Sequence, residues 1–244
     1  MITILIDSQK DTNFLRGAYD GLENNIVLVN PSREDAEKVL TEHPTERVML
    51  MGHGSPSGLF GRNWMGYVVD ARNAHLLKDR EVIGIWCYAK DFGKAMGLKG
   101  FFTSMFISNY GEYRSHFPNG KEYKDEEIFA EITNFVNLVN KYLKEDKPLD
   151  EWVEDMRNSA DYNKNFVEYN YDGLEYLDGT ETLTTRYVFD SATTETMLEG
   201  DADDAYQEFR FHTDNEELFS KTIDELIEYC FKEGYKASIR EMDM

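Results

Sequence analysis

Short apolar runs separated by polar segments recur through the first half of this chain. Five runs are rich in β-branched or aromatic residues and predict buried strands: Ile2–Ile6, Asn25–Asn30, Arg47–Met51, Glu81–Trp86 and Gly100–Ser108. Apolar residues at helical spacing between the runs predict helices that open after Pro31, cover about Tyr67–Leu77 and lie near Phe92–Met96. Strands that alternate with helices favour an α/β fold with a doubly wound, mainly parallel sheet flanked by helices.

Two local signals refine this first half. Ser32 precedes Arg33, Glu34 and Asp35, and a serine followed by acidic residues is typical of a capped helix start. The segment after His53, with the letters SPSGLFGRNWMG, is rich in glycine and predicts a turn or a short hairpin.

The pattern changes after about residue 120. A long amphipathic helix is predicted over residues 128–143, an ordered loop region over 161–180, a strand over 182–189 and a second helix over 214–231. We therefore divide the chain into a core of residues 1–120 and an acidic, mostly helical extension of residues 121–244 that completes or decorates that core.

Charge supports the same division. The net charge is −21; residues 1–120 hold 13 basic and 14 acidic residues, which leaves 13 basic and 33 acidic residues for 121–244. Such an acidic half repels nucleic acid and anionic lipid, contributes to solubility and attracts cationic partners. We therefore expect neither a nucleic-acid nor a membrane partner.

Composition indicates a soluble cytoplasmic protein. The mean hydropathy is −0.59 and no apolar run is long enough to span a bilayer. The first residues, MITILIDSQKD, lack the basic start and cleavage site of a secretory signal. The two cysteines, Cys87 and Cys230, are far apart, which favours a reducing compartment, and Cys230 lies on an apolar helical stripe typical of core packing.

Two predicted strands end in reactive side chains. The first is followed by Gly52, His53 and Gly54, and the second by Cys87. Because the carboxyl ends of neighbouring parallel strands meet at one edge of a sheet, an imidazole base and a thiol can come together there. Gly54 has no side chain, so a substrate carbonyl could approach its N–H group, and this N–H and that of Cys87 could form an oxyanion hole.

A strand ending in His-Gly, followed by a strand ending in Cys, resembles the caspase-like cysteine peptidases, which include caspases, metacaspases, clostripain, gingipains, separase and the CHAT peptidases. The resemblance covers residues 1–115 and extends to the stretch GLKGFFTSMFISNYGEY after Cys87. It implies a caspase-like fold in which His53 is the general base and acid, Cys87 the nucleophile and Gly54 part of the oxyanion hole. The thiol is then expected to have a lowered pKa if an imidazolium lies beside it.

The residues before Cys87 depart from the known members. Gly84, Ile85 and Trp86 match neither the caspase nor the metacaspase signature, which removes the easiest specificity residue. Members of this group accept either an acidic or a basic residue before the scissile bond, and the acidic charge of this chain favours a basic one. Candidate pocket acids at strand ends are Asp7, Asp11 and Glu112. The chain is thus predicted to cleave a protein or peptide after Arg or Lys.

Three alternatives stay open at this point. An inactive relative could serve as a binding or scaffold module. Gly54-Ser55-Pro56-Ser57-Gly58 matches G-x-S-x-G, so Ser57 could be a serine nucleophile, with His75, His116 or His212 as the base. No His or Cys spacing predicts zinc and no P-loop is present, so no cofactor is expected, but Asp201, Asp203 and Asp204 could hold Ca²⁺. The sequence leaves the oligomeric state open.

Overall fold

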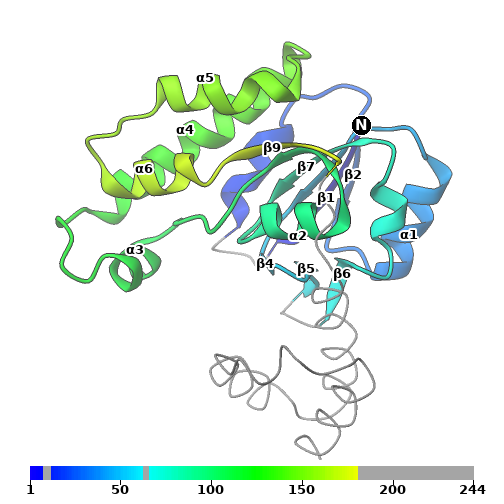
Figure 1. The fold of residues 1–244 in the computed structure, drawn as a ribbon, viewed down its shortest axis with the longest axis horizontal. Coiled ribbons are helices and arrows are strands. Elements are labelled where there is room, and N and C mark those ends of the chain that lie inside the picture. The colour runs from blue at the N-terminus through cyan, green and yellow to red at the C-terminus, as the bar shows by residue number, and fades with distance from the viewer. Residues whose placement is uncertain (8–11, 63–65, 181–244) are drawn as a thin grey trace, which may run out of the picture. The chain divides into compact units, whose positions relative to one another are not determined.

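A six-stranded mixed sheet forms the centre of the computed structural model, which describes residues 1–7, 12–62 and 66–180 (Figure 1). Its strands, in spatial order, are β2 (Ile26–Val29), β1 (Ile2–Leu5), β3 (Val48–Met51), β7 (Glu81–Ile85), β8 (Lys99–Phe102) and β9 (Glu175–Asp178). The first five are parallel, and β9 runs antiparallel to β8 at the edge. The predicted α/β fold with a mainly parallel sheet is confirmed.

Helices cover both faces of this sheet (Figure 1). The described helices are η1 (Asn13–Tyr19), α1 (Arg33–Glu42), η3 (Ala74–Leu77), α2 (Ala89–Met96), α3 (Tyr110–His116), α4 (Asp125–Lys144), η4 (Leu149–Glu151), α5 (Trp152–Ser159) and α6 (Asn165–Asp172). None of these helices is both long and apolar enough to cross a bilayer.

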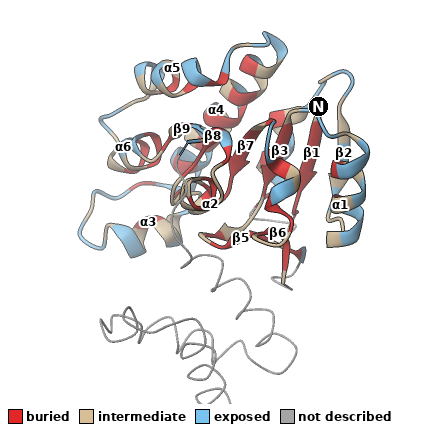
Figure 2. Cartoon of the chain, turned by 45° about the vertical axis from the view of Figure 1, so that its right-hand side comes forward, coloured by how far each residue is buried: buried red, intermediate tan, exposed pale blue. Residues whose placement is uncertain are grey.

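Successive side chains of each strand point to opposite faces, which makes two separate cores. Val48 and Leu50 of β3 pack with α1, α2 and η3, whereas Met49 and Met51 pack with η1, α4, α5 and α6. Figure 2 shows the inner strands β1, β3, β7 and β8 mostly buried, and the outer faces of the helices exposed. A strand buried on both faces must be apolar throughout, which explains the continuous apolar runs in the sequence.

Two predicted helix features are confirmed. Ser32 caps α1 with a capping box, in which its side chain accepts a hydrogen bond from the N–H of Asp35, while the Asp35 carboxylate accepts one from the N–H of Ser32. Helix α4 spans the predicted amphipathic segment, and its apolar face packs on η1 and the sheet. The helices after residue 120 therefore share a core with the first half.

The segment over 67–77 was predicted to be helical, and this is wrong for residues 67–70, whereas Ala74–Leu77 forms the short helix η3. Tyr67–Asp70 forms β6, which pairs antiparallel with β5 (Gly58–Phe60), and β5 pairs with β4 (Gly54–Ser55) in a small second sheet. Tyr and Val favour extended backbone, and pairing with β5 outweighs the helical spacing of the apolar residues. The predicted hairpin in the glycine-rich segment is confirmed by β4 and β5.

Two other predictions need correction. Strand β8 ends at Phe102 rather than at Ser108, because Phe106 and Ile107 enter the core from an irregular segment. Residues 161–180 are not a loop region, because they contain α6 and β9. Phe166 and Tyr171 of α6 are fully or almost fully buried. These tertiary contacts stabilise a helix of eight residues, which is too short to show a clear hydrophobic periodicity in the sequence.

The strand over 182–189, the helix over 214–231 and Cys230 lie outside the described residues. The division of the chain near residue 120 stays a prediction from composition and charge.

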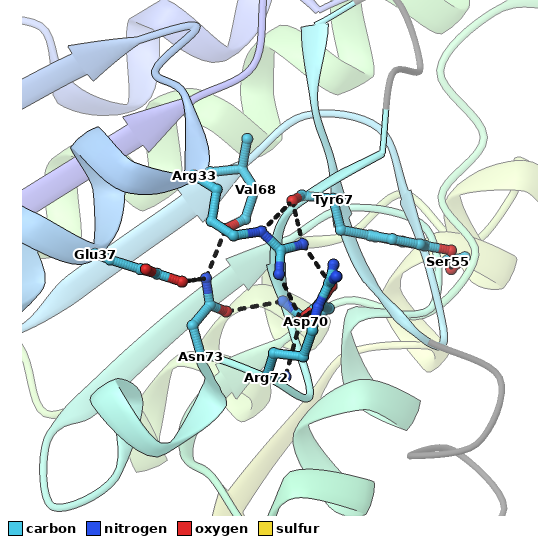
Figure 3. Close-up of polar contacts among 8 residues, drawn as sticks. All are labelled: Arg33, Glu37, Ser55, Tyr67, Val68, Asp70, Arg72 and Asn73. Atoms are coloured by element: carbon cyan, nitrogen blue, oxygen red, sulfur yellow. Dashed lines mark hydrogen bonds and ion pairs between the residues drawn. The ribbon is translucent and has the colours of Figure 1, made fainter. Parts of the chain in front are cut away.

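A buried ion cluster joins the small sheet to α1 (Figure 3). Asp70, which is fully buried, accepts hydrogen bonds from the guanidinium groups of Arg33, at 2.6 Å, and Arg72. Arg33 also donates to the carbonyl of Tyr67 at 2.6 Å, and Asn73 donates to the carbonyl of Val68 at 2.8 Å. The cluster holds β6, and through β5 it holds the hairpin that begins beside His53.

Replacing Asp70 with Asn is expected to lower the free energy of unfolding by about 2–3 kcal/mol, because it leaves two guanidiniums without their carboxylate; both keep some solvent contact, which limits the loss. Burial alone raises the pKa of Asp70, but the hydrogen bonds from Arg72 and Arg33 outweigh it and lower the pKa. The stabilisation is therefore present above about pH 4 and is lost as the pH falls through the folded-state pKa. Urea denaturation of both proteins from pH 7 down to pH 2 checks this: a difference that does not shrink below about pH 4 would contradict it.

Candidate active site

His53 and Cys87 lie at the same edge of neighbouring strands. Strands β3 and β7 pair in parallel with Met51 opposite Ile85, so each candidate residue is the second one beyond this pair. The N–H of Gly52 donates to the carbonyl of Ile85 at 3.2 Å, which keeps the two chains together past the last paired residues. Since neighbouring strands are about 4.8 Å apart, the two residues leave the sheet side by side. The prediction that the two strands are neighbours is confirmed.

The backbone is constrained on both sides of the candidate pair. Gly52 has φ of +148°, and a Cβ there would lie 2.8 Å from Cβ of Ile6, so the turn before His53 requires glycine. Tyr88 follows Cys87 and has φ of +68°, a left-handed conformation that costs a non-glycine residue about 1–2 kcal/mol. Strain of this kind gathers at functional sites, where the surrounding structure holds it in place.

The Cys87 thiol is half-buried, and its pKa is raised. Burial is the main cause, and the carboxylate of Glu112 raises the pKa further, while a backbone hydrogen bond from Phe106 lowers it. A lowered pKa was expected only with an imidazolium beside the thiol; the described surroundings raise the pKa instead. A thiol with a raised pKa is protonated at neutral pH, so it needs a base to remove its proton during attack.

The candidate pocket acids differ in their surroundings. Asp7 lies at the same sheet edge, two residues beyond Leu5, but its carboxylate is paired with the guanidinium of Arg16 at 2.5 Å. Asp11 lies outside the described residues. Glu112, in the first turn of α3, accepts hydrogen bonds from the N–H and hydroxyl of Ser108 at 2.6 and 2.9 Å through one carboxylate oxygen.

Within residues 1–7, 12–62 and 66–180, no basic side chain forms an ion pair with Glu112. Its charge nonetheless reaches the Cys87 thiol. Of the two described candidate acids, Glu112 is the one whose negative charge stays uncompensated beside the thiol.

Gly54 is packed against the indole ring of Trp86. A Cβ at Gly54 would lie 2.1 Å from Cδ1 of Trp86 and 2.6 Å from the carbonyl oxygen of Gly58. The indole N–H in turn donates to the carbonyl of Ser55 at 3.1 Å. Packing therefore requires glycine at this position, and its part in an oxyanion hole stays a prediction.

Ser57 does not have the surroundings of a nucleophile elbow. It lies with Pro56 in the two-residue turn between β4 and β5, where Ser55 pairs with Gly58, and its N–H donates to the hydroxyl of Ser55 at 3.1 Å. A G-x-S-x-G nucleophile needs a strand before it and a helix after it. The motif here is part of a hairpin, which removes the structural basis for a serine hydrolase.

Sequence reasoning missed one residue of the second half that lies near the thiol. Burial is the main cause that raises the pKa of Tyr169 of α6, and the charges of Tyr88 and Cys87 raise it further. Its ring stacks on His116 with the centroids 5.3 Å apart. One tyrosine in a segment with many tyrosines and no clear period carries no sequence signal, and only the packing of α6 brings it here.

One hollow of the described surface, with a volume of about 840 Å³, lies away from this site. It is lined by residues that begin the strands, including Arg47, Glu81 and Lys99, so it is at the opposite edge of the sheet. Arg47 is already paired with Glu81 at 2.6 Å and with Asp146 at 3.5 Å. The chemistry of His53 and Cys87, rather than the size of this hollow, therefore indicates the candidate site.

No group of three or more His, Cys, Asp or Glu side chains in the described part of the chain is arranged to hold a metal ion. Asp201, Asp203 and Asp204 lie outside the described residues, and calcium binding by them stays a prediction.

No protein-family model matches the chain, and no curated protein matches it. The resemblance to caspase-like peptidases therefore rests on the strand-end residues quoted above.

Proposed function

We propose that this protein is a cysteine endopeptidase with a caspase-like, doubly wound core, in which His53 and Cys87 form the catalytic dyad. The observation that carries this proposal is their equivalent position two residues beyond the paired Met51 and Ile85 of neighbouring parallel strands. Strained backbone at Tyr88 and the Glu112 carboxylate, which has no cationic partner among the described residues, lie near the same thiol. A cytoplasmic location suits a nucleophile that must stay reduced.

In the proposed reaction, Sγ of Cys87 attacks the carbonyl carbon of the scissile bond while its proton passes to the imidazole of His53. The imidazolium then protonates the leaving amine, and a thioester to Cys87 remains. Water attacks the thioester, His53 accepts its proton, and the acid product leaves as the thiol is restored. The N–H groups of Gly54 and Cys87 would stabilise the negative oxygen of each tetrahedral intermediate.

Glu112 is the proposed selector of a basic residue before the scissile bond. One of its oxygens is held by Ser108, and the described residues offer it no cationic partner. A guanidinium or ammonium group of the substrate would compensate this charge and strengthen its binding. The expected substrate is a protein or peptide cleaved after Arg or Lys.

Labelling with peptidyl acyloxymethyl ketones tests the proposal. Intact-mass analysis is expected to show one adduct with a ketone ending in Arg, much less with one ending in Asp, and none on the Cys87→Ala variant. Labelling by the Asp ketone alone would keep the peptidase but contradict the role of Glu112. Absence of an adduct with either ketone, in a folded protein, would favour the inactive binding module.

A further inference from the structure

The segment between β8 and α3, residues 103–109, contacts the candidate nucleophile at several points. At its start, the hydroxyl of Thr103 donates to the carbonyl of Trp86, the residue before Cys87, at 2.8 Å. In its middle, the backbone N–H of Phe106 faces the Cys87 thiol closely enough to lower its pKa. Towards its end, Ser108 holds the carboxylate of Glu112 at 2.6 Å. This segment thus carries both a donor to the thiol and the support of the proposed selector.

One side chain from the second half of the chain clamps the middle of this segment. Asn170 of α6 accepts a hydrogen bond from the N–H of Ile107 at 2.7 Å and donates to the carbonyl of Ile107 at 2.9 Å. Its side-chain amide therefore satisfies both backbone groups of one residue, as a neighbouring strand would. Asn170 is only 4% exposed, so water cannot readily replace it.

The clamped residue lies between the two functional groups. Phe106 precedes Ile107 and Ser108 follows it, so movement of Ile107 displaces both neighbours. Helix α6 is itself anchored, because Phe166 and Tyr171 are buried in the core beneath it. A rigid helix thereby fixes the middle of an irregular segment whose start, at Thr103, is bonded to the backbone of Gly84.

We propose that Asn170 is a positioning residue, whose clamp on Ile107 holds the Phe106 donor and the Ser108–Glu112 pair in place around Cys87. The expected effect of Asn170 on substrate selectivity rests on the proposed peptidase function. Its expected effect on the Cys87 thiol is independent of that function. Loss of the clamp weakens the hydrogen bond to the sulfur, so it disfavours the thiolate. It also loosens Glu112, so it reduces the preference for a basic residue.

The test uses Asn170→Leu in a Cys230→Ala background. The chain has two cysteines, so this background leaves Cys87 as the single thiol that can be alkylated. The rate of alkylation by iodoacetamide is measured between pH 6 and pH 11. We expect the midpoint to rise by about one pH unit, and the rate at pH 7 to fall about tenfold, since a hydrogen bond to a charged group contributes roughly this factor. The labelling ratio of Arg ketone to Asp ketone is expected to fall by about the same factor.

Asn140→Leu is the matched control. Asn140 of α4 also holds a distant backbone segment through its side-chain amide, donating to the carbonyls of Ala18 and Asp20 at 3.1 and 3.0 Å, and none of these residues is among the groups that shift the pKa of Cys87. Its loss is expected to reduce stability without moving the alkylation midpoint. If Asn170→Leu does not fold, Asn170→Ser replaces it, because the smaller side chain leaves room for water to reach Ile107.

A folded Asn170 variant with the wild-type alkylation midpoint would overturn the proposal, and so would an equal shift in Asn140→Leu. These readings stay separate from the proposed function, because iodoacetamide reacts with the thiol whether or not the protein cleaves peptides. A shifted midpoint in a protein that neither ketone labels would support the clamp and contradict the peptidase.

Discussion

Replacement of Cys87 with Ala is expected to abolish cleavage of an arginyl peptide amide, and replacement of His53 with Ala to lower kcat/KM by about 10³–10⁴-fold. The effect of His53 is expected to be large because the pKa of Cys87 is raised, chiefly by burial and also by Glu112. Little thiolate exists at neutral pH, so attack depends on a base that takes the proton as the bond forms. The measurement is kcat/KM from pH 6 to pH 10 for each purified variant.

Two further variants distinguish the proposed cysteine peptidase from a serine hydrolase that uses Ser57. His75→Ala removes an exposed imidazole of η3 and is expected to leave kcat/KM within about twofold. Ser57→Ala is expected to behave in the same way, since Ser57 lies in a hairpin turn. Turnover that survives in Cys87→Ala but disappears in Ser57→Ala would instead establish a serine hydrolase.

Glu112→Gln is expected to change two properties in opposite directions. The preference for Arg over an uncharged residue before the scissile bond should fall about a hundredfold, because the charge that compensates the substrate guanidinium is gone. Alkylation of Cys87 at pH 7 should become faster, because the same carboxylate raises the pKa of the thiol. Gln keeps an oxygen that can accept from Ser108, so the local fold is retained.

The two effects are measured separately, by kcat/KM for matched Arg and Gln peptides and by the rate with iodoacetamide. Glu168→Gln, which removes an exposed carboxylate from α6 next to Tyr169, is the charge-matched control and should change neither. A Glu112→Gln variant that loses the Arg preference without faster alkylation would mean that Glu112 acts on the substrate but not on the thiol. Faster alkylation with an unchanged preference would rule out its role as selector.

Much of the core could be predicted from the sequence, because each feature depends on residues close together in the chain. Strands β1, β3 and β7 are apolar apart from Thr3 and Glu81, as is typical of strands buried on both faces. Ser32 and Asp35 cap α1 through contacts three residues apart. The common sheet edge of His53 and Cys87 follows from two such strands being neighbours.

The errors fall where long-range pairing outweighs the local pattern. Tyr67–Asp70 has helical spacing of apolar residues but becomes β6, because β5 offers it a hydrogen-bonding partner. Residues 161–180 have no clear period, yet α6 forms because Phe166 and Tyr171 find a core to enter, and β9 forms because β8 has a free edge. Neither partner can be read from the segment itself.

The sequence by itself determined the α/β alternation, the two strand-end residues His53 and Cys87, and an uneven distribution of charge. Only the tertiary structure decided which candidate acid is neutralised, since Asp7 meets Arg16 whereas Glu112 meets Ser108. The tertiary structure also brings Asn170 to Ile107, a residue 63 positions away in the sequence, where its side chain forms the clamp. Burial and ion pairing depend on which distant groups share a small volume, and hydrophobic periodicity carries no information about that.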